Sequence, residues 1–371
     1  MHILEKEKIK NMKIITVIGT RPELIRLSII IEKLDTLVDH ILVYTNQNYD
    51  YNLSTRFFDD LKIRKPDYYM KKQAISFADF LSNAILKFEE IIIKERPDKM
   101  LVLGDTNSGL LAIIAERYKI PVYHMEAGNR CFDDRLPEEA NRKIIDSVAR
   151  YNLPYTENSK QNLLREGFHK NFVFKTGNPI YEVLNKYDFQ IKSSVMMNEW
   201  NLLDNANIPI DFVLATLHRT ENVDEPNTIH NIINALNYIS QSIKVVVSLH
   251  PRTKNKIDKF GYKLNDNILV SPPMGFFDFV NLERHARCVI SDSGTVQEEC
   301  CIFGIPALTI RESTERQETI ECGSNILCGT KTENILNAFN AVMKRKNKWY
   351  VPDDYLLENV SDTVINILLG K

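Results

Sequence analysis

A short apolar run, a turn and a helix-like segment follow one another repeatedly along this chain. The runs are mostly apolar and rich in Val, Ile and Leu, and they cover residues 13–18, 40–44, 99–103, 121–125, 212–217, 244–249, 267–270, 288–290 and 306–310. Continuous apolar strands that alternate with helices are typical of parallel sheets covered by helices on both faces. The pattern therefore predicts an α/β fold.

The segments between these runs show the helical spacing of apolar residues. Helices are expected from Pro22, over residues 77–94, 110–118, 227–239 and 296–303, and in the tail over 334–344 and 355–369. Pro22 suits a first helical position because its missing N–H is not needed there.

The pattern breaks once, after Asn178-Pro179, and then restarts. A chain of 371 residues suits two domains rather than one core. We predict two Rossmann-like domains with parallel sheets and a central cleft, residues 12–180 and 181–353, and expect the final helix within 354–371 to join the first domain. Ligands of such sheets bind beyond the carboxyl ends of the strands, so the residues that follow each strand are the candidates for function.

Composition excludes several classes of protein. A net charge of -2 gives no basic footprint for nucleic acid, and the longest apolar runs are too short to span a membrane. Residues 1–11 are charged and predict a short extension rather than a signal peptide. The six cysteines form no Cys-x-x-Cys pair and have no histidine cluster beside them, which argues against a metal site and suits a reducing cytoplasm.

Polar side chains follow the strands of the first half. Arg21 lies in the turn after the first strand, at a helix start suited to phosphate. Asp105 follows the third strand, Glu126 follows the fourth, and Glu138 opens a helix after Pro137. Each of these three residues also has an explanation that needs no ligand. Arg21 could be an ordinary surface arginine, Asp105 could cap a helix, and Glu138 could interact with the helix dipole from the first turn.

Three of these carboxylates, Asp105, Glu126 and Glu138, should converge on one edge of the sheet. Carboxylates that lie close together raise one another's pKa. A site obtains an acid and a base at neutral pH in this way.

The second half carries polar groups in corresponding places. His218 and Arg219 end one strand and His250 ends the next, with a core histidine as the alternative for each. Ser293-Gly294 opens a helix whose N–H groups suit a diphosphate, and Glu299, one turn in, suits ribose hydroxyls. An ordinary N-cap with acidic neighbours would explain the same residues. The first strand is followed by no Gly-x-Gly-x-x-Gly and the chain has no Walker loop, which argues against nicotinamide and ATP cofactors.

Taken together, these segments resemble the non-hydrolysing branch of the UDP-N-acetylglucosamine 2-epimerase family. The matches run in order over nearly the whole chain: GTRPE (19–23), GDT (104–106), MEAG (125–128), PEEANR (137–142), TGNP (176–179), HR-x-EN (218–222), HP (250–251), DSG-x-x-QEE (292–299) and R-x-x-TER (311–316). Each motif alone is weak, but the ordered set is highly specific.

The resemblance implies a glycosyltransferase-B-like pair of domains, a homodimer, and an isomerase that needs neither nicotinamide nor metal. In this family a base removes the proton on sugar C2 while UDP leaves C1 by anti elimination. UDP then adds back to the 2-acetamidoglucal after protonation on the other face of C2. The reaction would turn UDP-N-acetylglucosamine into UDP-N-acetylmannosamine, a precursor of surface polysaccharides.

By the same resemblance, Asp105, Glu126, Glu138 and His218 would carry catalysis. Which carboxylate acts on which face of C2 stays open. The substrate-binding set would consist of Arg21, Arg26, Arg142, Arg219, His250, Phe279, Ser293, Gly294, Glu299 and Arg316. Phe279 lies where the family places an aromatic residue near the nucleotide.

Two departures from the family pattern bear on these expectations. The family usually has Lys where this chain has Arg26, which keeps the charge but changes its geometry. The segment 46–50 replaces a signature that helps bacterial members bind a second, activating UDP-N-acetylglucosamine, which puts allosteric activation in doubt.

The same analysis leaves other functions open. Residues 129–133 and 48–51 resemble a subgroup that converts UDP-2-acetamido-2,6-dideoxy-L-talose to UDP-N-acetyl-L-fucosamine. A hydrolysing 2-epimerase would release UDP and free N-acetylmannosamine. A glycosyltransferase on the same fold would require an acceptor and would not exchange the C2 proton.

Overall fold

The computed structural model describes residues 12–45, 57–70 and 75–370. The chain forms two compact units. One contains the described residues up to Val183 together with those from Leu356 onward, and the other runs from Leu184 to Tyr355. Each unit is described by itself below.

A six-stranded sheet forms the centre of the first unit. Its strands are β1 (Lys13–Ile18), β2 (Asp39–Tyr44), β3 (Tyr68–Tyr69), β4 (Lys99–Leu103), β5 (Val122–Met125) and β6 (Tyr151–Leu153). Their order is β3-β2-β1-β4-β5-β6, and every neighbouring pair is parallel. The order reverses at β1 and β4, where a ligand site is expected in an open parallel sheet.

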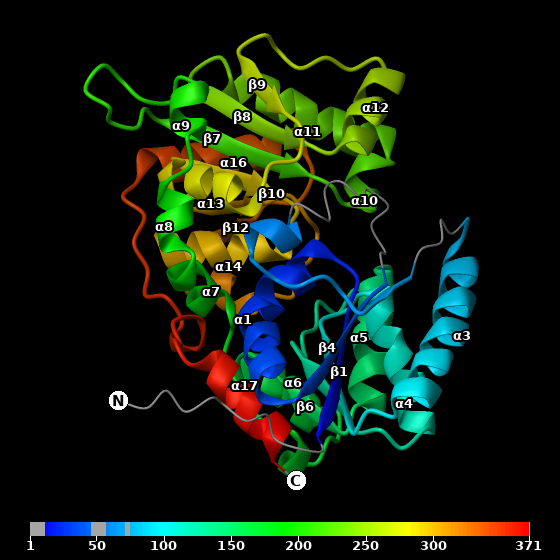
Figure 1. The fold of residues 1–371 in the computed structure, drawn as a ribbon. Coiled ribbons are helices and arrows are strands. Elements are labelled where there is room, and N and C mark those ends of the chain that lie inside the picture. Colours follow the sequence, from blue (N-terminus) through cyan, green and yellow to red (C-terminus); the bar gives the residue numbers. More distant parts are fainter. Residues whose placement is uncertain (1–11, 46–56, 71–74, 371) are drawn as a thin grey trace, which may run out of the picture. The chain divides into compact units, whose positions relative to one another are not determined.

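Helices cover the faces of this sheet (Figure 1). They are α1 (Arg21–Leu37), α3 (Phe77–Glu95), α4 (Ala112–Arg117), α5 (Pro137–Val148), α6 (Glu157–Arg165) and α17 (Val360–Leu369), with single 3₁₀ turns at Asn107–Leu111 and Lys170–Phe172. Helix α7 (Ile180–Lys186) crosses the boundary between the units. The C-terminal helix α17 packs against α1, where Lys33 donates to the Ser361 hydroxyl at 2.7 Å.

The second unit repeats the architecture. Its strands are β7 (Phe212–Leu217), β8 (Lys244–Leu249), β9 (Ile268–Ser271), β10 (Cys288–Ser291), β11 (Ala307–Thr309) and β12 (Asn325–Leu327), in the order β12-β11-β10-β7-β8-β9. All neighbours are again parallel. The helices are α8 (Asp188–Lys192), α9 (Met196–Glu199), α10 (Thr220–Val223), α11 (Pro226–Ile239), α12 (Pro251–Lys259), α13 (Phe276–His285), α14 (Gly294–Phe303), α15 (Gln317–Glu321) and α16 (Thr332–Lys344), with a 3₁₀ turn at Asp353–Tyr355.

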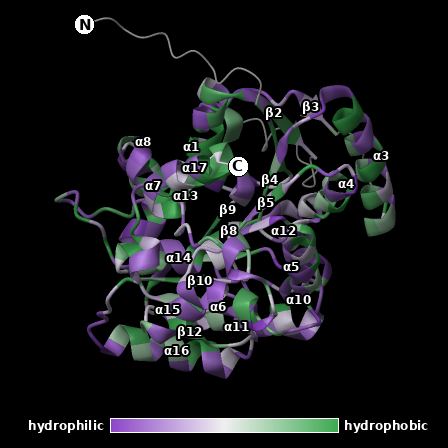
Figure 2. Ribbon diagram, turned by 90° about the horizontal axis from the view of Figure 1, so that it is seen from below, coloured by the Kyte–Doolittle hydropathy of each residue, from purple (hydrophilic) through white to green (hydrophobic). Residues whose placement is uncertain are grey.

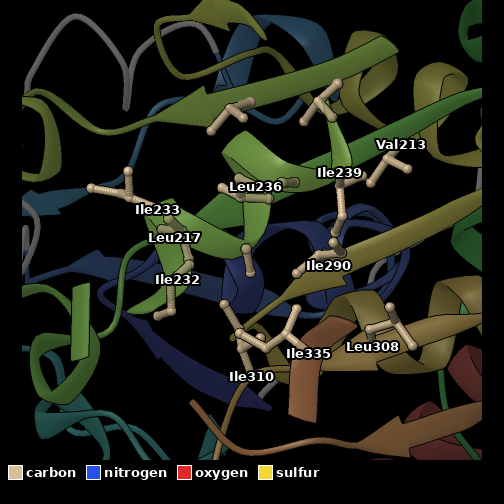
Figure 3. Packing of buried hydrophobic residues seen from close by; sticks show 14 of the residues in the cluster. Val213, Leu217, Ile232, Ile233, Leu236, Ile239, Ile290, Leu308, Ile310 and Ile335 are labelled. Atoms are coloured by element: carbon tan, nitrogen blue, oxygen red, sulfur yellow. The ribbon is translucent and has the colours of Figure 1, made fainter. Parts of the chain in front are cut away.

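Apolar side chains from strands and helices meet in the core of the second unit. Figure 3 shows Val213, Leu217 and Ile290 from the sheet against Ile232 and Leu236 from α11, all nearly inaccessible to solvent. In α3 and α16, hydrophobic and hydrophilic residues alternate along the ribbon, as expected of helices with one face packed on a sheet (Figure 2). Burial at roughly 25 cal/mol per Å² of apolar surface stabilises such a packing.

The predicted fold class, α/β with two parallel sheets, is confirmed. Three short strands, β3, β6 and β12, were not predicted, because runs of two or three residues leave no readable apolar pattern. The helix predicted over 110–118 is in part a 3₁₀ turn over Asn107–Leu111, and the tail helix predicted from residue 355 begins only at Val360. None of the helices within the described residues combines the length and the apolar character that a membrane crossing requires.

Candidate active site

The turn after β1 is held by a buried carboxylate. Glu23 accepts from the backbone N–H groups of Gly19 at 3.0 Å and Thr20 at 2.7 Å, and from the hydroxyl of Thr106 at 3.0 Å. Burial raises the pKa of Glu23 to about 7 although these donors oppose the shift. Because Thr106 follows β4, Glu23 ties together the two turns at which the strand order reverses.

Arg21 is the first residue of α1 and is half-buried. Its guanidinium lies over the ring of Phe57, 5.3 Å from the centroid. Cations at the start of a helix oppose the helix dipole, so α1 itself gains nothing from this charge. The position therefore suits the binding of an anion better than the stability of the helix.

Glu126 follows β5 in an unusual backbone conformation. Its φ is +65°, which non-glycine residues seldom adopt, and its side chain is nearly buried. One carboxylate oxygen lies 2.6 Å from the Nη1 atom of Arg26, which is itself 2 % exposed. The other oxygen accepts from the Asn129 amide at 3.2 Å. The structure thus aims Glu126 back at α1 and fixes it there with a buried arginine.

Asp105 follows β4 and faces a second arginine. Arg142 of α5 donates to its carboxylate at 2.5 Å and to Glu139 at 2.7 Å. A Cβ added to Gly104, the residue before Asp105, would lie 3.8 Å from the Glu126 carboxylate. The structure therefore brings Asp105 and Glu126 to the same edge of the first sheet, each paired with its own arginine.

Glu138 and Glu139 occupy the first turn of α5 but differ in their surroundings. Glu138 is half-buried. Glu139 is fully buried and accepts from the backbone of Cys131 and Phe132. Burial opposes ionisation of Glu139, but the donors from Cys131 and the charge of Arg142 lower its pKa. Glu139 therefore holds Arg142 against Asp105, a role that sequence reasoning missed.

A buried polar network lies under the carboxylates. His124 of β5 faces the carbonyl oxygen of Gly104 at 2.9 Å through Nε2 and the Asp146 carboxylate at 2.8 Å through Nδ1. The carbonyl can only accept, so Nε2 carries a proton. Arg130 donates to the same Asp146 at 2.7 Å. This network fixes the turn that presents Asp105.

In the second unit, His218 follows β7 and lies against Asp292, the residue after β10. Its Nδ1 is 2.9 Å from the Asp292 carboxylate, while about half of the side chain is exposed. Asp292 also accepts from the Arg219 backbone N–H at 3.0 Å and the Asn222 amide at 3.2 Å. Asp292 is fully buried, which opposes ionisation, but the charge and hydrogen bonds of His218 and Arg219 lower its pKa to about 2. The carboxylate therefore orients the imidazole and leaves its Nε2 side accessible.

The start of α14 is surrounded by charged groups. Ser293 precedes the helix, and a Cβ on Gly294 would come within 2.6 Å of Glu315 and 3.8 Å of the Arg316 guanidinium. Arg316 is buried and lies 2.5 Å from Glu298. Arg219 lies 4.0 Å from Glu315. Any larger residue at 294 would push the Glu315 carboxylate aside, and two predicted arginines, Arg219 and Arg316, lie against that carboxylate.

Glu299 is buried in the second turn of α14 beside Glu283 of α13. Burial and the neighbouring Glu299 carboxylate raise the pKa of Glu283 well above its ordinary value. Two buried carboxyl groups of this kind share a proton. With the proton on Glu283, Glu299 stays an acceptor for hydroxyl donors.

The remaining predicted residues lie nearby in the fold. His250 follows β8, whose Leu249 pairs with Leu217 of β7, so His218 and His250 leave the same sheet edge. His250 is exposed, and its Nδ1 accepts from the Arg252 backbone N–H at 3.2 Å. Phe279 of α13 is half-buried and packs against an apolar cluster that includes Val296 of α14. The 46–50 and 48–51 segments lie outside the described residues.

Among residues 12–45, 57–70 and 75–370, three or more His, Cys, Asp or Glu side chains never gather closely enough to hold a metal ion. What the two units offer instead is organic acid–base groups and anion-binding groups. The first unit presents paired carboxylates, and the second presents a helix start with arginines and an oriented histidine. This set of groups is that of an enzyme that performs acid–base chemistry on an anionic substrate.

The comparisons with known proteins define the family. Residues 32–369 match the family model described as UDP-N-acetylglucosamine 2-epimerase, and the chain belongs to this family. The UDP-N-acetylglucosamine 2-epimerase of Methanocaldococcus jannaschii is 37% identical over 92% of this chain and 95% of its own.

Solved structures agree with this assignment. The M. jannaschii enzyme in complex with UDP-GlcNAc and UDP has a TM-score of 0.89 at 35% identity, over 96% of this chain and 99% of that chain. The UDP-N-acetylglucosamine 2-epimerase of Rickettsia bellii has a TM-score of 0.87 at 40% identity, over 96% of both chains.

Proposed function

We propose that this chain interconverts UDP-N-acetylglucosamine and UDP-N-acetylmannosamine by epimerisation at C2. The observation that carries the proposal is the pair of arginine-bound carboxylates, Asp105 and Glu126, at one sheet edge of a chain that belongs to this family. An epimerase must remove a proton from one face of C2 and return one to the other. Two fixed carboxylates supply the groups that this requires.

We assign the binding of UDP to the second unit. The diphosphate would accept from the free N–H groups at the start of α14, next to Gly294, where Arg219 and Arg316 supply positive charge. Glu299 would accept from the ribose hydroxyls, and Phe279 and His250 would complete the nucleotide side of the site. Arg21 would contact the same substrate from the start of α1.

The chemistry proceeds by elimination and re-addition. A carboxylate takes the proton from C2, the C1–O bond to UDP breaks, and a 2-acetamidoglucal and UDP remain bound. Arg21 and His218 would stabilise the negative charge that develops on the leaving diphosphate. UDP then adds back to C1 as C2 is protonated on the opposite face. We assign the proton transfers to Asp105, Glu126 and Glu138.

The decisive experiment is incubation with UDP-N-acetylglucosamine in D2O, followed by NMR. Deuterium at C2 with UDP still attached is the expected outcome. Free N-acetylmannosamine with UDP would instead identify a hydrolysing enzyme. Transfer that requires an acceptor, without exchange at C2, would identify a glycosyltransferase.

The same experiment with UDP-2-acetamido-2,6-dideoxy-L-talose tests the sugar. The 6-deoxy sugar is a second candidate only through residues 48–51 and 129–133, the first of which lies outside the described residues. Turnover of the 6-deoxy sugar alone would move the substrate to the fucosamine-forming class.

We also propose that the chain forms a homodimer. Leu86 and Ile93, two turns apart on one face of α3, are 62% and 55% exposed. Residues at i and i+7 lie on one side of a helix, so these two exposed apolar side chains share one face of α3, on either side of the charged Glu89 and Glu90. A second copy of the chain would cover this face.

We propose a cytoplasmic location for the enzyme. The six cysteines are scattered along the chain and form no Cys-x-x-Cys pair, a usage that suits a reducing compartment. Detection of the native chain in the cytosolic fraction of its own cells would support the proposal.

A further inference from the structure

Two cysteines far apart in the sequence lie against each other in the second unit. The Sγ atom of Cys301, near the end of α14, is 3.7 Å from the Sγ atom of Cys322, which follows α15. Both thiols are free. A disulfide requires a separation of about 2.05 Å, so the two sulfur atoms must approach by roughly a further 1.6 Å to form the bond.

The two thiols differ in access. Cys301 is fully buried, whereas Cys322 is partly exposed and lines a surface hollow of about 900 Å³ together with Trp349 and Tyr350. The indole N–H of Trp349 donates to the backbone carbonyl of Cys301 at 2.9 Å. The hollow therefore gives a small reagent a path to Cys322, whereas Cys301 is buried and does not line the hollow.

The surroundings of Cys322 include one group that can stabilise its thiolate. The Ser324 hydroxyl, 3.4 Å from the Cys322 Sγ, can donate to a thiolate, whereas the Thr319 carbonyl oxygen at 3.6 Å can only accept from the thiol. A hydrogen bond from the Cys301 thiol lowers the pKa of Cys322, and the same contact raises the pKa of Cys301. The accessible thiol is thus the stronger nucleophile at neutral pH, and the buried thiol is its neutral neighbour.

From the contact between the two sulfur atoms and the hollow beside them, we propose that Cys301 and Cys322 form a reversible disulfide when the protein meets a peroxide. The inference does not depend on the proposed epimerase activity. The other thiols of the second unit, Cys288, Cys300 and Cys328, are buried and would stay reduced.

The reaction balances in two steps. The Cys322 thiolate attacks one oxygen of hydrogen peroxide, the O–O bond breaks, and hydroxide leaves and takes up a proton, so that Cys322 becomes a sulfenic acid. The Cys301 sulfur then attacks the Cys322 sulfur, the S–O bond breaks, and the departing hydroxide takes the Cys301 proton as water. The two cysteines are oxidised by two electrons and one peroxide is reduced to two waters.

The bond would cross-link α14 to the end of α15. Glu298 of α14 already lies 2.5 Å from Arg316, which immediately precedes α15. The disulfide would add a covalent tie one turn further along α14. A dithiol reductant would break this disulfide by thiol–disulfide exchange and restore the two free thiols.

The test uses the full chain, first reduced and then exposed to a small excess of hydrogen peroxide. Free thiols are blocked with iodoacetamide, and peptides are mapped by mass spectrometry without reduction. The expected result is a peptide pair joined through Cys301 and Cys322, which dithiothreitol separates. In the reduced protein, iodoacetamide should label Cys322 about tenfold faster than the buried Cys288.

Three variants separate the roles. In Cys301→Ser, peroxide should leave Cys322 as a sulfenic acid that dimedone traps. In Cys322→Ser, Cys301 should stay reduced. The control Cys131→Ser, in the first unit, should give the disulfide at the wild-type yield. A disulfide between any other pair of cysteines in the wild-type chain, or labelling of Cys322 no faster than Cys288, would overturn the proposal. Both measurements are made on the wild-type chain, so they do not depend on whether a variant folds.

Discussion

Replacing Asp292 by Asn should leave the shape of the second unit intact and still remove the orientation of His218. Both Asp292 oxygens accept hydrogen bonds in the native protein, one from the His218 ring and the other from the Arg219 backbone and the Asn222 amide. An asparagine has only one oxygen. Its oxygen would take the position with the Arg219 and Asn222 donors, and its NH2 group would face His218 Nδ1. The imidazole would then accept at Nδ1 and lose both the carboxylate that orients it and that carboxylate's negative charge, which favours the positive ring that a leaving diphosphate needs.

The magnitude follows from two parts of the structure. An exchanged tautomer of a carboxylate-oriented histidine costs as much as about 10⁴ in rate in serine proteases, so we expect a loss of kcat on the order of 10²–10⁴, or about 3–5 kcal/mol. The lowering of the Asp292 pKa from 3.8 to about 2 corresponds to roughly 2–3 kcal/mol of stability. Because the folded-state pKa is lowered, this stability is present above about pH 4 and is lost as the pH falls toward 2.

A double-mutant cycle with His218→Ala provides the assay. Turnover of UDP-N-acetylglucosamine and unfolding by urea are measured for both single variants and for the double variant. In the His218→Ala background, Asp292→Asn should lower kcat less than about threefold, because the oriented group is already gone. Fully additive losses, or a folded Asp292→Asn enzyme within tenfold of the wild-type kcat, would refute the argument.

Four further outcomes are expected. Asp105→Asn should abolish turnover while UDP binding, measured by calorimetry, stays nearly unchanged; unimpaired turnover would remove Asp105 from the mechanism. Glu23→Ala strands buried donors of Gly19 and Thr20 and should cost about 2–4 kcal/mol in urea unfolding, whereas Glu23→Gln, which keeps an acceptor there, should cost less than about 1 kcal/mol. Leu86→Glu should shift the particle measured by light scattering from dimer to monomer, and the matched Lys87→Glu should not. Glu126→Gln should stop exchange of the C2 proton with D2O, and retained exchange would assign that proton transfer elsewhere.

The strand ends could be predicted from sequence because their signal is local. Asp105, Glu126 and His218 each follow a continuous apolar run. The fold itself seldom requires a polar side chain at that point, so such residues are candidates for ligand binding. The parallel pairing then places Asp105 and Glu126 at one sheet edge without further information. Their arginine partners could not be predicted in this way, since Arg26 and Arg142 come from helices distant in the sequence.

Glu138 and Glu139 show where sequence reasoning stops. Both lie in the first turn of α5, where any carboxylate interacts favourably with the helix dipole. Neighbouring helical residues point about 100° apart, so only one of them can face Arg142. The spacing of three residues from Glu139 to Arg142 was the available signal, because such pairs meet on a helix surface. The sequence does not show which face is inward, and that face decides the role.

Glu126 joins a local signal to a conformation that the sequence does not reveal. A non-glycine residue at φ +65° costs roughly 1–2 kcal/mol, and its ion pair with Arg26 removes a guanidinium from water as well. Both features destabilise the fold at the end of this buried strand. A glycine in place of Glu126 and an apolar residue in place of Arg26 would avoid the two costs. Unfavourable arrangements of this kind persist where function requires them. The strained backbone and the buried ion pair are therefore in keeping with a functional role for Glu126.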